Sequence, residues 1–392
     1  MGSQRDALFH FNKKTAVILL MNVAFLPLAY SDSQLVTDRV TEFSFYPSYV
    51  NDQTLSNPFA KQLPAVNSGD ETVFANTRFR VTKEKFSFEV EPELRVLHSS
   101  HSLSVSSRSS VHAPSRIMGL DWKAGSDLRT ESTYGFERLN LDYHSEVAEL
   151  SVGRKPVSLG VLSVFPVWNK FTRPLMTDFG PLRVFSQDQA SFRIQQGSFA
   201  FQATDIEEKQ SSGAARLAEV AAYGESQELH LLGGQWWQHA VGGLAAVKDL
   251  AGTSVRTEGL WVSQEGVQAG LGAERALSET WSVLTEFLYV GNGAPDKKFY
   301  LTLPYSRFRP LTAQGYGYAR LEYKPSALWT FQLGSLLNFI DSSQLVNGKI
   351  IYSLSNDAEL TLELRDPIGE NGSELSKQVL PVQLIAGLKW TF

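Results

Sequence analysis

The stretch Leu380-Pro-Val-Gln-Leu-Ile-Ala-Gly-Leu-Lys-Trp-Thr-Phe392 decides the fold class. Every second residue from Leu380 to Phe392 is apolar, and Gln383, Lys389 and Thr391 are among the residues between them. A period of two indicates a β-strand, and about 13 residues is longer than most strands of globular proteins. A tilted strand that crosses a bilayer needs about 9–11 residues, with one face toward lipid and one toward a lumen. This stretch therefore predicts a membrane-spanning strand.

The last residues of this strand carry a resemblance. Gly387, Trp390 and Phe392 form the pattern Gly-x-x-Trp-x-Phe. The pattern resembles the terminal insertion signal of bacterial outer-membrane β-barrels, although Ile385 stands where that signal prefers a polar residue. The resemblance implies that the barrel assembly machinery binds the chain through its C-terminal strand.

The first 31 residues have the pattern of a secretory signal peptide. Arg5, Lys13 and Lys14 precede an apolar run over residues 15–29, and the small residues Ala29 and Ser31 precede a cleavage point. No later stretch has 18 consecutive apolar residues, so we expect no membrane-spanning helix in residues 32–392. An exported chain of this kind is either soluble outside the inner membrane or a β-barrel.

Composition excludes several classes of site. The 392 residues include 36 Lys and Arg against 41 Asp and Glu, a net charge of −5, and no cysteine. A chain without cysteine has no disulfide and no thiolate metal site or nucleophile. A nucleic-acid partner is not expected, because such proteins need a basic surface. We find no metal-ligand spacing and expect no cofactor.

Alternating segments fill the rest of the chain and predict about eighteen strands, with sixteen or fourteen as alternatives. The connections also alternate between short and long, as in outer-membrane barrels with short periplasmic turns and long outer loops. Two connections, at 237–238 and 264–266, are short where long ones are expected, and there we expect the strand count to fail. The sequence thus predicts one all-β domain, a transmembrane antiparallel β-barrel over residues 32–392.

Charged residues oppose the apolar face on these strands and would point into the lumen. They either line a channel or pair across neighbouring strands and stiffen the wall. Glu258, Glu274 and Glu286 lie on inward faces as well. The predicted lining and constriction residues are Arg78, Arg80, Glu89, Glu91, Glu93, Arg95, Arg138, Arg154, Lys155, Lys170, Arg173, Arg193, Arg320 and Glu322.

The connection over residues 156–189 is long and unusually apolar for a loop. Left in water it would expose a large apolar patch. We expect it to fold into the lumen, pack on the wall and narrow the pore, which would put Arg154, Lys155, Lys170 and Arg173 near the constriction. The alternative is that it covers the outer rim, against lipopolysaccharide or a partner.

The same segment carries a second resemblance. Gly153-Arg154-Lys155, followed by Gly160 and Phe165, is similar to a strand and loop of the alginate-export family of outer-membrane barrels. That resemblance implies eighteen strands. Lys155 replaces the glutamine of that family, and the balanced charges predicted for the lumen differ from the strongly basic lumen that an alginate exporter needs.

These patterns predict a channel in the bacterial outer membrane, surrounded by lipid and lipopolysaccharide, for passive passage or export of a small hydrophilic solute. One alternative is a non-conducting barrel that serves as a surface scaffold, an adhesin or a partner subunit. Another is a lipid-active enzyme that uses the histidines and serines of residues 98–102. We favour a protein that is not an enzyme.

Overall fold

The computed structural model describes residues 36–50, 68–99, 118–126, 130–157, 159–165, 167–169, 171, 186–208, 215–300, 302–303, 306, 308–309, 311–376 and 382–390. The predicted signal peptide, Lys170, Arg173, Phe392 and residues 100–102 lie outside these residues. In the described part, no helix has the length and apolar character needed to cross a bilayer.

The described chain forms a single sheet of nineteen strands and one short 3-10 helix, η2. The elements are β1 (Val36–Val50), β2 (Ser68–Lys83), β3 (Phe86–Ser99), β4 (Asp121–Ser126), β5 (Thr130–His144), β6 (Ala148–Pro156), β7 (Ser186–Gln196), β8 (Phe199–Glu207), β9 (Ala215–Tyr223), β10 (Gln227–Trp236), β11 (His239–Leu250), β12 (Thr253–Val262), β13 (Gly266–Ala276), β14 (Trp281–Val290), η2 (Lys297–Phe299), β15 (Gly315–Ser326), β16 (Trp329–Asn338), β17 (Gln344–Ser353), β18 (Ala358–Ile368) and β19 (Gln383–Trp390).

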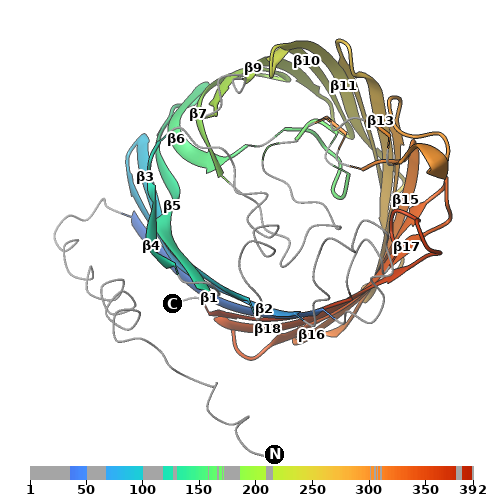
Figure 1. Cartoon of the computed structure of the whole chain (residues 1–392). Helices are drawn as coiled ribbons and strands as arrows, with labels where there is room; N and C mark the ends of the chain where they lie inside the picture. Colours follow the sequence, from blue (N-terminus) through green and yellow to red (C-terminus); the bar gives the residue numbers. More distant parts are fainter. Residues whose placement is uncertain are drawn as a thin grey trace, which may run out of the picture.

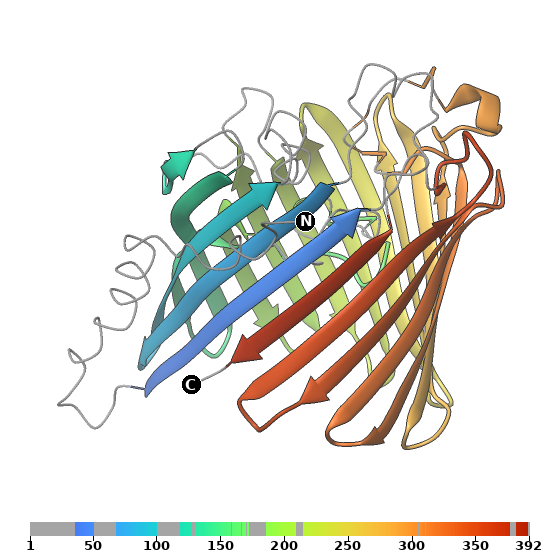
Figure 2. The same cartoon turned by 60° about the horizontal axis from the view of Figure 1, so that its bottom comes forward.

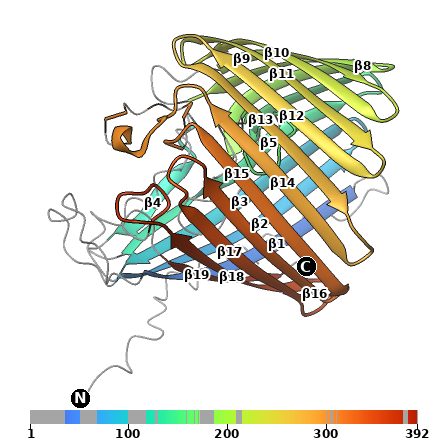
Figure 3. The ribbon, with the colours of Figure 1, turned by 90° about the vertical axis from the view of Figure 1, so that its right-hand side faces the viewer.

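The sheet closes into a barrel. Each wall strand pairs antiparallel with the next one along the chain, for example β1 with β2 and β18 with β19. The first strand, β1, lies against the last, β19, so the wall has no free edge there (Figures 1 and 2). The strands run obliquely around the barrel (Figure 3), as closure of a sheet requires. The predicted all-β antiparallel barrel is confirmed.

The strand β4 was not expected. It pairs with the first half of β5, from Gly135 to Glu131, whereas β6 pairs with the second half of β5, from Leu139 onward. The two strands therefore share one edge of β5, and β4 extends the sheet beyond the end of β6. Its six residues are too few for a clear period-two pattern.

Tight connections join the strands at one end of the barrel, which we call the short-turn rim (Figure 2). Its turns are residues 84–85, 145–147, 197–198, 224–226, 251–252, 277–280, 327–328 and 354–357. The opposite end, the long-loop rim, carries the connections 157–185, 291–314 and 369–382. The predicted alternation of short and long connections therefore holds over most of the described barrel.

The two exceptions at the long-loop rim are hairpin turns. Trp237 and Gln238 alone connect β10 to β11, and both have positive φ, 48° and 71°. Two successive residues with positive φ form the turn that matches the twist of a two-residue hairpin. Gln264, with φ of 70°, lies in the second exception, between β12 and β13. Each of these connections is short because a tight hairpin turn joins its two strands. The strands predicted on either side are present.

Large apolar side chains on the strands are exposed, whereas several carboxylates on the strands are buried. Leu231 on β10 is 52% exposed and Leu271 on β13 is 50% exposed, whereas Glu89 on β3 is 2% and Glu286 on β14 is 0% exposed. A soluble protein would bury the leucines and expose the carboxylates. The exposed apolar band and the polar interior are the arrangement of a barrel in a bilayer.

Aromatic side chains gather at the short-turn rim. Trp281 stacks on Tyr323 with ring centroids 4.3 Å apart, and Trp329 lies 4.3 Å from Tyr352. Such aromatic girdles lie at the boundary between hydrocarbon and water.

Candidate functional site

The candidate site is the lumen and the segment that enters it. We call the described residues of 157–171 the inward segment. They lie inside the ring of strands (Figure 1). Seven apolar side chains of the segment are buried: Val157, Leu159, Leu162, Phe165, Val167, Trp168 and Phe171. They belong to the same core cluster as inner-wall residues of β9–β16, so the segment packs on one side of the lumen.

Two wall carboxylates hold the backbone of the inward segment. Glu258 on β12 accepts hydrogen bonds from the amides of Val161, Leu162 and Trp168, the last two at 2.7 and 3.1 Å. The amide groups of a non-regular segment need acceptors when they are buried, and a carboxylate is a strong one.

Glu286 on β14 acts in the same way on the next residues. Its two oxygens accept from the amides of Ser163, Val164 and Phe165 at 2.6, 2.8 and 2.9 Å. Because Glu286 is fully buried, the six amides and two carboxylates form one hydrogen-bonded interface away from water. The wall thereby holds the main chain of the segment as well as its side chains.

Glycines on the inner wall receive the side chains of the segment. A β-carbon on Gly243 of β11 would lie 2.9 Å from the ring of Trp168, and one on Gly270 of β13 would overlap Leu162. The Trp168 indole also donates to the carbonyl oxygen of Gly259 at 2.9 Å. Wall and segment are complementary in shape as well as in hydrogen bonding.

The far end of the inward segment meets an aromatic cluster at the long-loop rim. The ring of Phe171 stacks on Trp236 with centroids 4.8 Å apart and lies 5.3 Å from Trp237. Phe308, from the connection between β14 and β15, contacts both tryptophans at 5.4 and 5.1 Å. The unusual two-residue turn between β10 and β11 therefore presents a tryptophan pair to the segment.

Arg154, at the base of the segment, is fully buried. Its Nε donates to Asp188 Oδ1 at 2.8 Å, and its Nη atoms donate to the carbonyl oxygens of Phe136 and Met118 at 2.9 and 2.7 Å. The guanidinium thus joins β5, β6, β7 and the residues that lead into β4. Its donors are directed into the wall, where they stabilise the entry to the segment.

Two of the predicted lining carboxylates, Glu89 and Glu91, form one ion-pair network on β2, β3 and β5, and a third forms a separate pair on β3. Glu89 accepts from Arg80 at 2.5 Å and from Arg138 at 3.0 Å, and Arg138 also binds Glu91 at 3.0 Å. Glu93 pairs with Arg95 at 3.1 Å. The pairs of Glu89 and Glu91 span neighbouring strands, whereas Glu93 and Arg95 lie on the same strand.

The remaining predicted residues are dispersed. Lys155 lies 3.5 Å from Asp142, and Glu322 accepts from Lys324 at 2.7 Å and from Gln332 at 2.6 Å. Arg78 and Arg320 are half-buried on β2 and β15. Whether any of these residues contacts a solute stays a prediction. Among the described side chains, no group of three or more His, Cys, Asp or Glu residues could hold a metal ion.

A second polar cluster links the loops of the long-loop rim. Glu374, after β18, accepts from the Tyr316 hydroxyl at 2.5 Å, from the Asn338 amide at 2.9 Å and from the Thr312 amide at 2.6 Å. Its own amide donates to Asp341 at 2.8 Å. Burial raises the pKa of Glu374, and the bonds from Tyr316 and Thr312 offset part of that rise. Sequence patterns gave no signal for this cluster, because Thr312, Asp341 and Glu374 lie in three different connections and the other two members lie on β15 and β16.

Solved structures with the same architecture are bacterial outer-membrane porins. OccAB4 of Acinetobacter baumannii has a TM-score of 0.53 at 9% identity, over 90% of this chain and 97% of that one. OccD3 (OpdP) of Pseudomonas aeruginosa has a TM-score of 0.52 at 10% identity, over 92% and 93%. OccK7 (OpdD) of the same organism has a TM-score of 0.51 at 11% identity, over 92% and 99%.

The fold is therefore that of a porin-like outer-membrane β-barrel. No protein-family model and no curated protein sequence matches the chain. These comparisons do not test the resemblance to the alginate-export family, which stays a prediction.

Proposed function

We propose that the protein is a channel of the bacterial outer membrane that passes a small hydrophilic solute through a charged lumen. The short-turn rim would face the periplasm and the long-loop rim the outside, after removal of a signal peptide over residues 1–31. The observation that carries the proposal is the inward segment, which hydrogen-bonds to Glu258 and Glu286 on one side of a wide barrel. A segment fixed in this way would narrow the lumen on one side and leave a passage for solute on the other.

The charges of the wall support passage of a hydrophilic solute. Cations and anions alternate on the inner faces of β2, β3 and β5, as in the pairs of Glu89 with Arg80 and Arg138. Paired charges hydrate the pore while they leave little net field, so we propose weak selectivity between small ions. We propose no reaction, because the charged residues described above pair with one another or bind the inward segment.

The test is planar-bilayer conductance of the purified full-length mature protein, followed by solute swelling of vesicles that contain it. We expect stable single-channel steps and faster swelling with small hydrophilic solutes than with larger ones. A protein that inserts into bilayers with intact strand content but gives no conductance would overturn the proposal in favour of a non-conducting scaffold. A denatured sample is recognised by its loss of β-structure in circular dichroism.

A further inference from the structure

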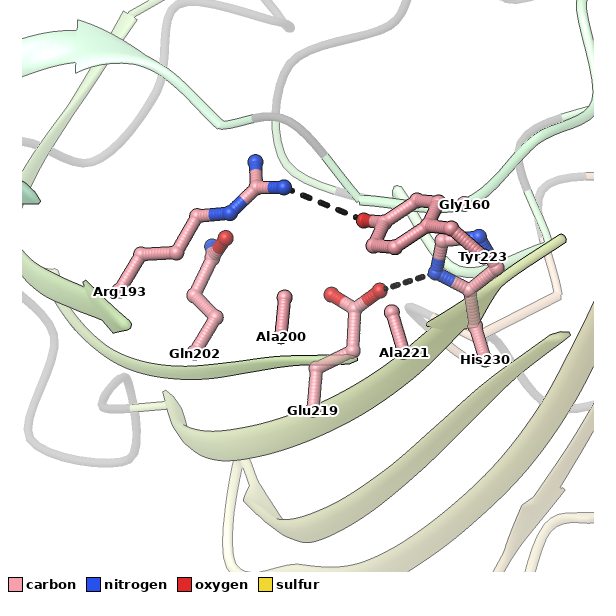
Figure 4. A pocket seen from close by; sticks show the side chains of 8 residues that line it. All are labelled: Gly160, Arg193, Ala200, Gln202, Glu219, Ala221, Tyr223 and His230. Carbon is pink, nitrogen blue, oxygen red and sulfur yellow. Dashed lines mark hydrogen bonds and ion pairs between the residues drawn. The ribbon is translucent and has the colours of Figure 1, made fainter. Parts of the chain in front are cut away.

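The inner wall formed by β7–β10 contains a pocket that the ion-pair network and the inward segment leave open (Figure 4). Its volume is about 170 Å³, room for several water molecules. The wall residues that matter for its chemistry are Arg193, Ala200, Gln202, Glu219, Ala221 and His230.

The strand register explains why a hollow forms here. Arg193, Gln202 and Glu219 are direct partners across β7, β8 and β9, so they form one polar row. The next row contains Ala200 and Ala221, which are also direct partners. Two alanines beside three long polar side chains leave a depression, and the alanine methyl groups form its floor.

The pocket has a donor end and an acceptor end. Arg193 donates to the hydroxyl of Tyr223 and to the amide oxygen of Gln195, both at 3.2 Å, and both of these partners are neutral. At the other end Glu219 binds the Nδ1 of His230 at 2.7 Å (Figure 4). Gln202, which can donate and accept, lies between them in the row.

This distribution of charge disfavours ligands that carry a net charge. An anion that approaches Arg193 also approaches the carboxylate of Glu219, and a cation near Glu219 approaches the guanidinium. Hydroxyl groups both donate and accept, so a neutral polyhydroxylated molecule satisfies both ends at once. The floor of alanine methyl groups suits the C–H face of such a molecule.

The inward segment passes beside this pocket. Gly160 borders it, with φ of 77°, and a β-carbon there would overlap the carboxylate of Glu258. The glycine therefore permits the close approach of the segment to the wall at this point. A solute that passes the segment on this side of the lumen meets the pocket.

We propose that this pocket is a binding subsite for a neutral, hydroxyl-rich solute of monosaccharide size. The inference rests on the proposed channel function and adds the class of solute to it. Binding is expected to be weak, because a channel must release what it binds.

Binding is tested by saturation-transfer NMR of D-glucose with the full-length mature protein in detergent micelles, which does not depend on conductance. The comparison probes are acetate, glycine, and triethylene glycol dimethyl ether, a neutral molecule of similar size without donors. We expect transfer to glucose only. Equal transfer to the ether would show that the pocket accommodates any molecule of this size and would overturn recognition of hydroxyl groups. Stronger transfer to acetate or glycine would overturn the assignment to neutral solutes.

The variant Ala221→Leu fills the pocket, and Ala222→Leu is its matched control, because Ala222 is the adjacent residue on the outward face of β9. Glu219→Gln and Gln202→Leu leave the floor intact and provide a second route if Ala221→Leu does not fold. We expect loss of glucose transfer in Ala221→Leu, about tenfold weaker binding in Gln202→Leu, and no change in the control. Wild-type binding in all three pocket variants would overturn the subsite.

Conductance separates this inference from the proposed function. A conducting protein without transfer to glucose contradicts the subsite alone. A protein that binds glucose and does not conduct contradicts the channel alone.

Discussion

The indole ring of Trp168 lies directly against Gly243, where a β-carbon would be 2.9 Å from three atoms of the ring. Trp168 is fully buried and cannot turn away without losing its hydrogen bond to Gly259. Contact between Trp168 and the wall therefore depends on the absence of a side chain at Gly243.

The variant Gly243→Ala should weaken this contact. Overpacking of a tight interior costs about 1–3 kcal/mol, and the segment is the part that can yield. We expect larger single-channel conductance and a change in tryptophan fluorescence. The control is Gly242→Ala, because a β-carbon on Gly242 has open space within 4 Å. Equal effects of the two variants would contradict the role of Gly243.

The double variant Glu258→Gln, Glu286→Gln should release the segment further. Hydrogen bonds to charged groups contribute about 1.5–3 kcal/mol each, and each amide side chain places an NH₂ group where backbone N–H groups converge. We expect conductance to rise above that of Gly243→Ala. Glu322→Gln is the control, since Glu322 contacts Gln332 and Lys324 and not the segment. Unchanged conductance in the double variant would show that the segment does not limit the pore.

The variant Arg138→Gln should make the pore more cation-selective. Arg138 neutralises Glu89 and Glu91 on the inner wall. Its loss leaves Glu89 paired with the cation Arg80 and Glu91 bonded to the neutral amide of Asn76. The reversal potential under a salt gradient measures this shift, which should shrink at high salt. The control, Arg216→Gln, removes a charge that pairs with Asp205 and is 70% exposed. A shift of the same size in the control would place the effect outside the lumen.

The variant Arg154→Met should destabilise the barrel by about 3–5 kcal/mol, because it leaves the buried Asp188 without its counter-ion. Thermal unfolding followed by circular dichroism measures the loss. Adding Asp188→Asn should recover most of it, since the asparagine oxygen can still accept from the amide of Met118, which binds Asp188 at 2.8 Å. No recovery would indicate that Arg154 acts mainly through the carbonyl groups it binds.

Acid should stabilise the cluster around Glu374. Burial raises the pKa of this carboxyl above its ordinary 4.5, so the folded state favours the protonated form. Its contribution to stability is fully present below the unfolded pKa and is lost as pH rises through the folded pKa. We expect protection of the Thr312 amide from hydrogen exchange, corrected for intrinsic rates, to fall over that range. In Glu374→Gln the corrected protection should be independent of pH, and a retained dependence would assign it to another group.

Period-two patterns were sufficient to predict the barrel, because lipid outside and water inside impose opposite demands on successive residues. The same patterns placed Glu258 and Glu286 on the inner face. They could not predict what these carboxylates bind, since Glu286 and Ser163 are 123 residues apart. The turn at Trp237 and Gln238 was obscure because neither residue is a glycine or asparagine, the usual markers of positive φ. The alanine floor at Ala200 and Ala221 depends on register between strands, which no single-strand pattern contains.

The seam where β1 meets β19 has a consequence for biosynthesis. One side of this seam is β1 and the other is β19, which is made later, so a fragment that lacks β19 has two open sheet edges. Open edges promote aggregation. Quality control of this protein should therefore remove such truncated products before they aggregate. Chaperones should matter most for β1, which is exposed until β19 has been made.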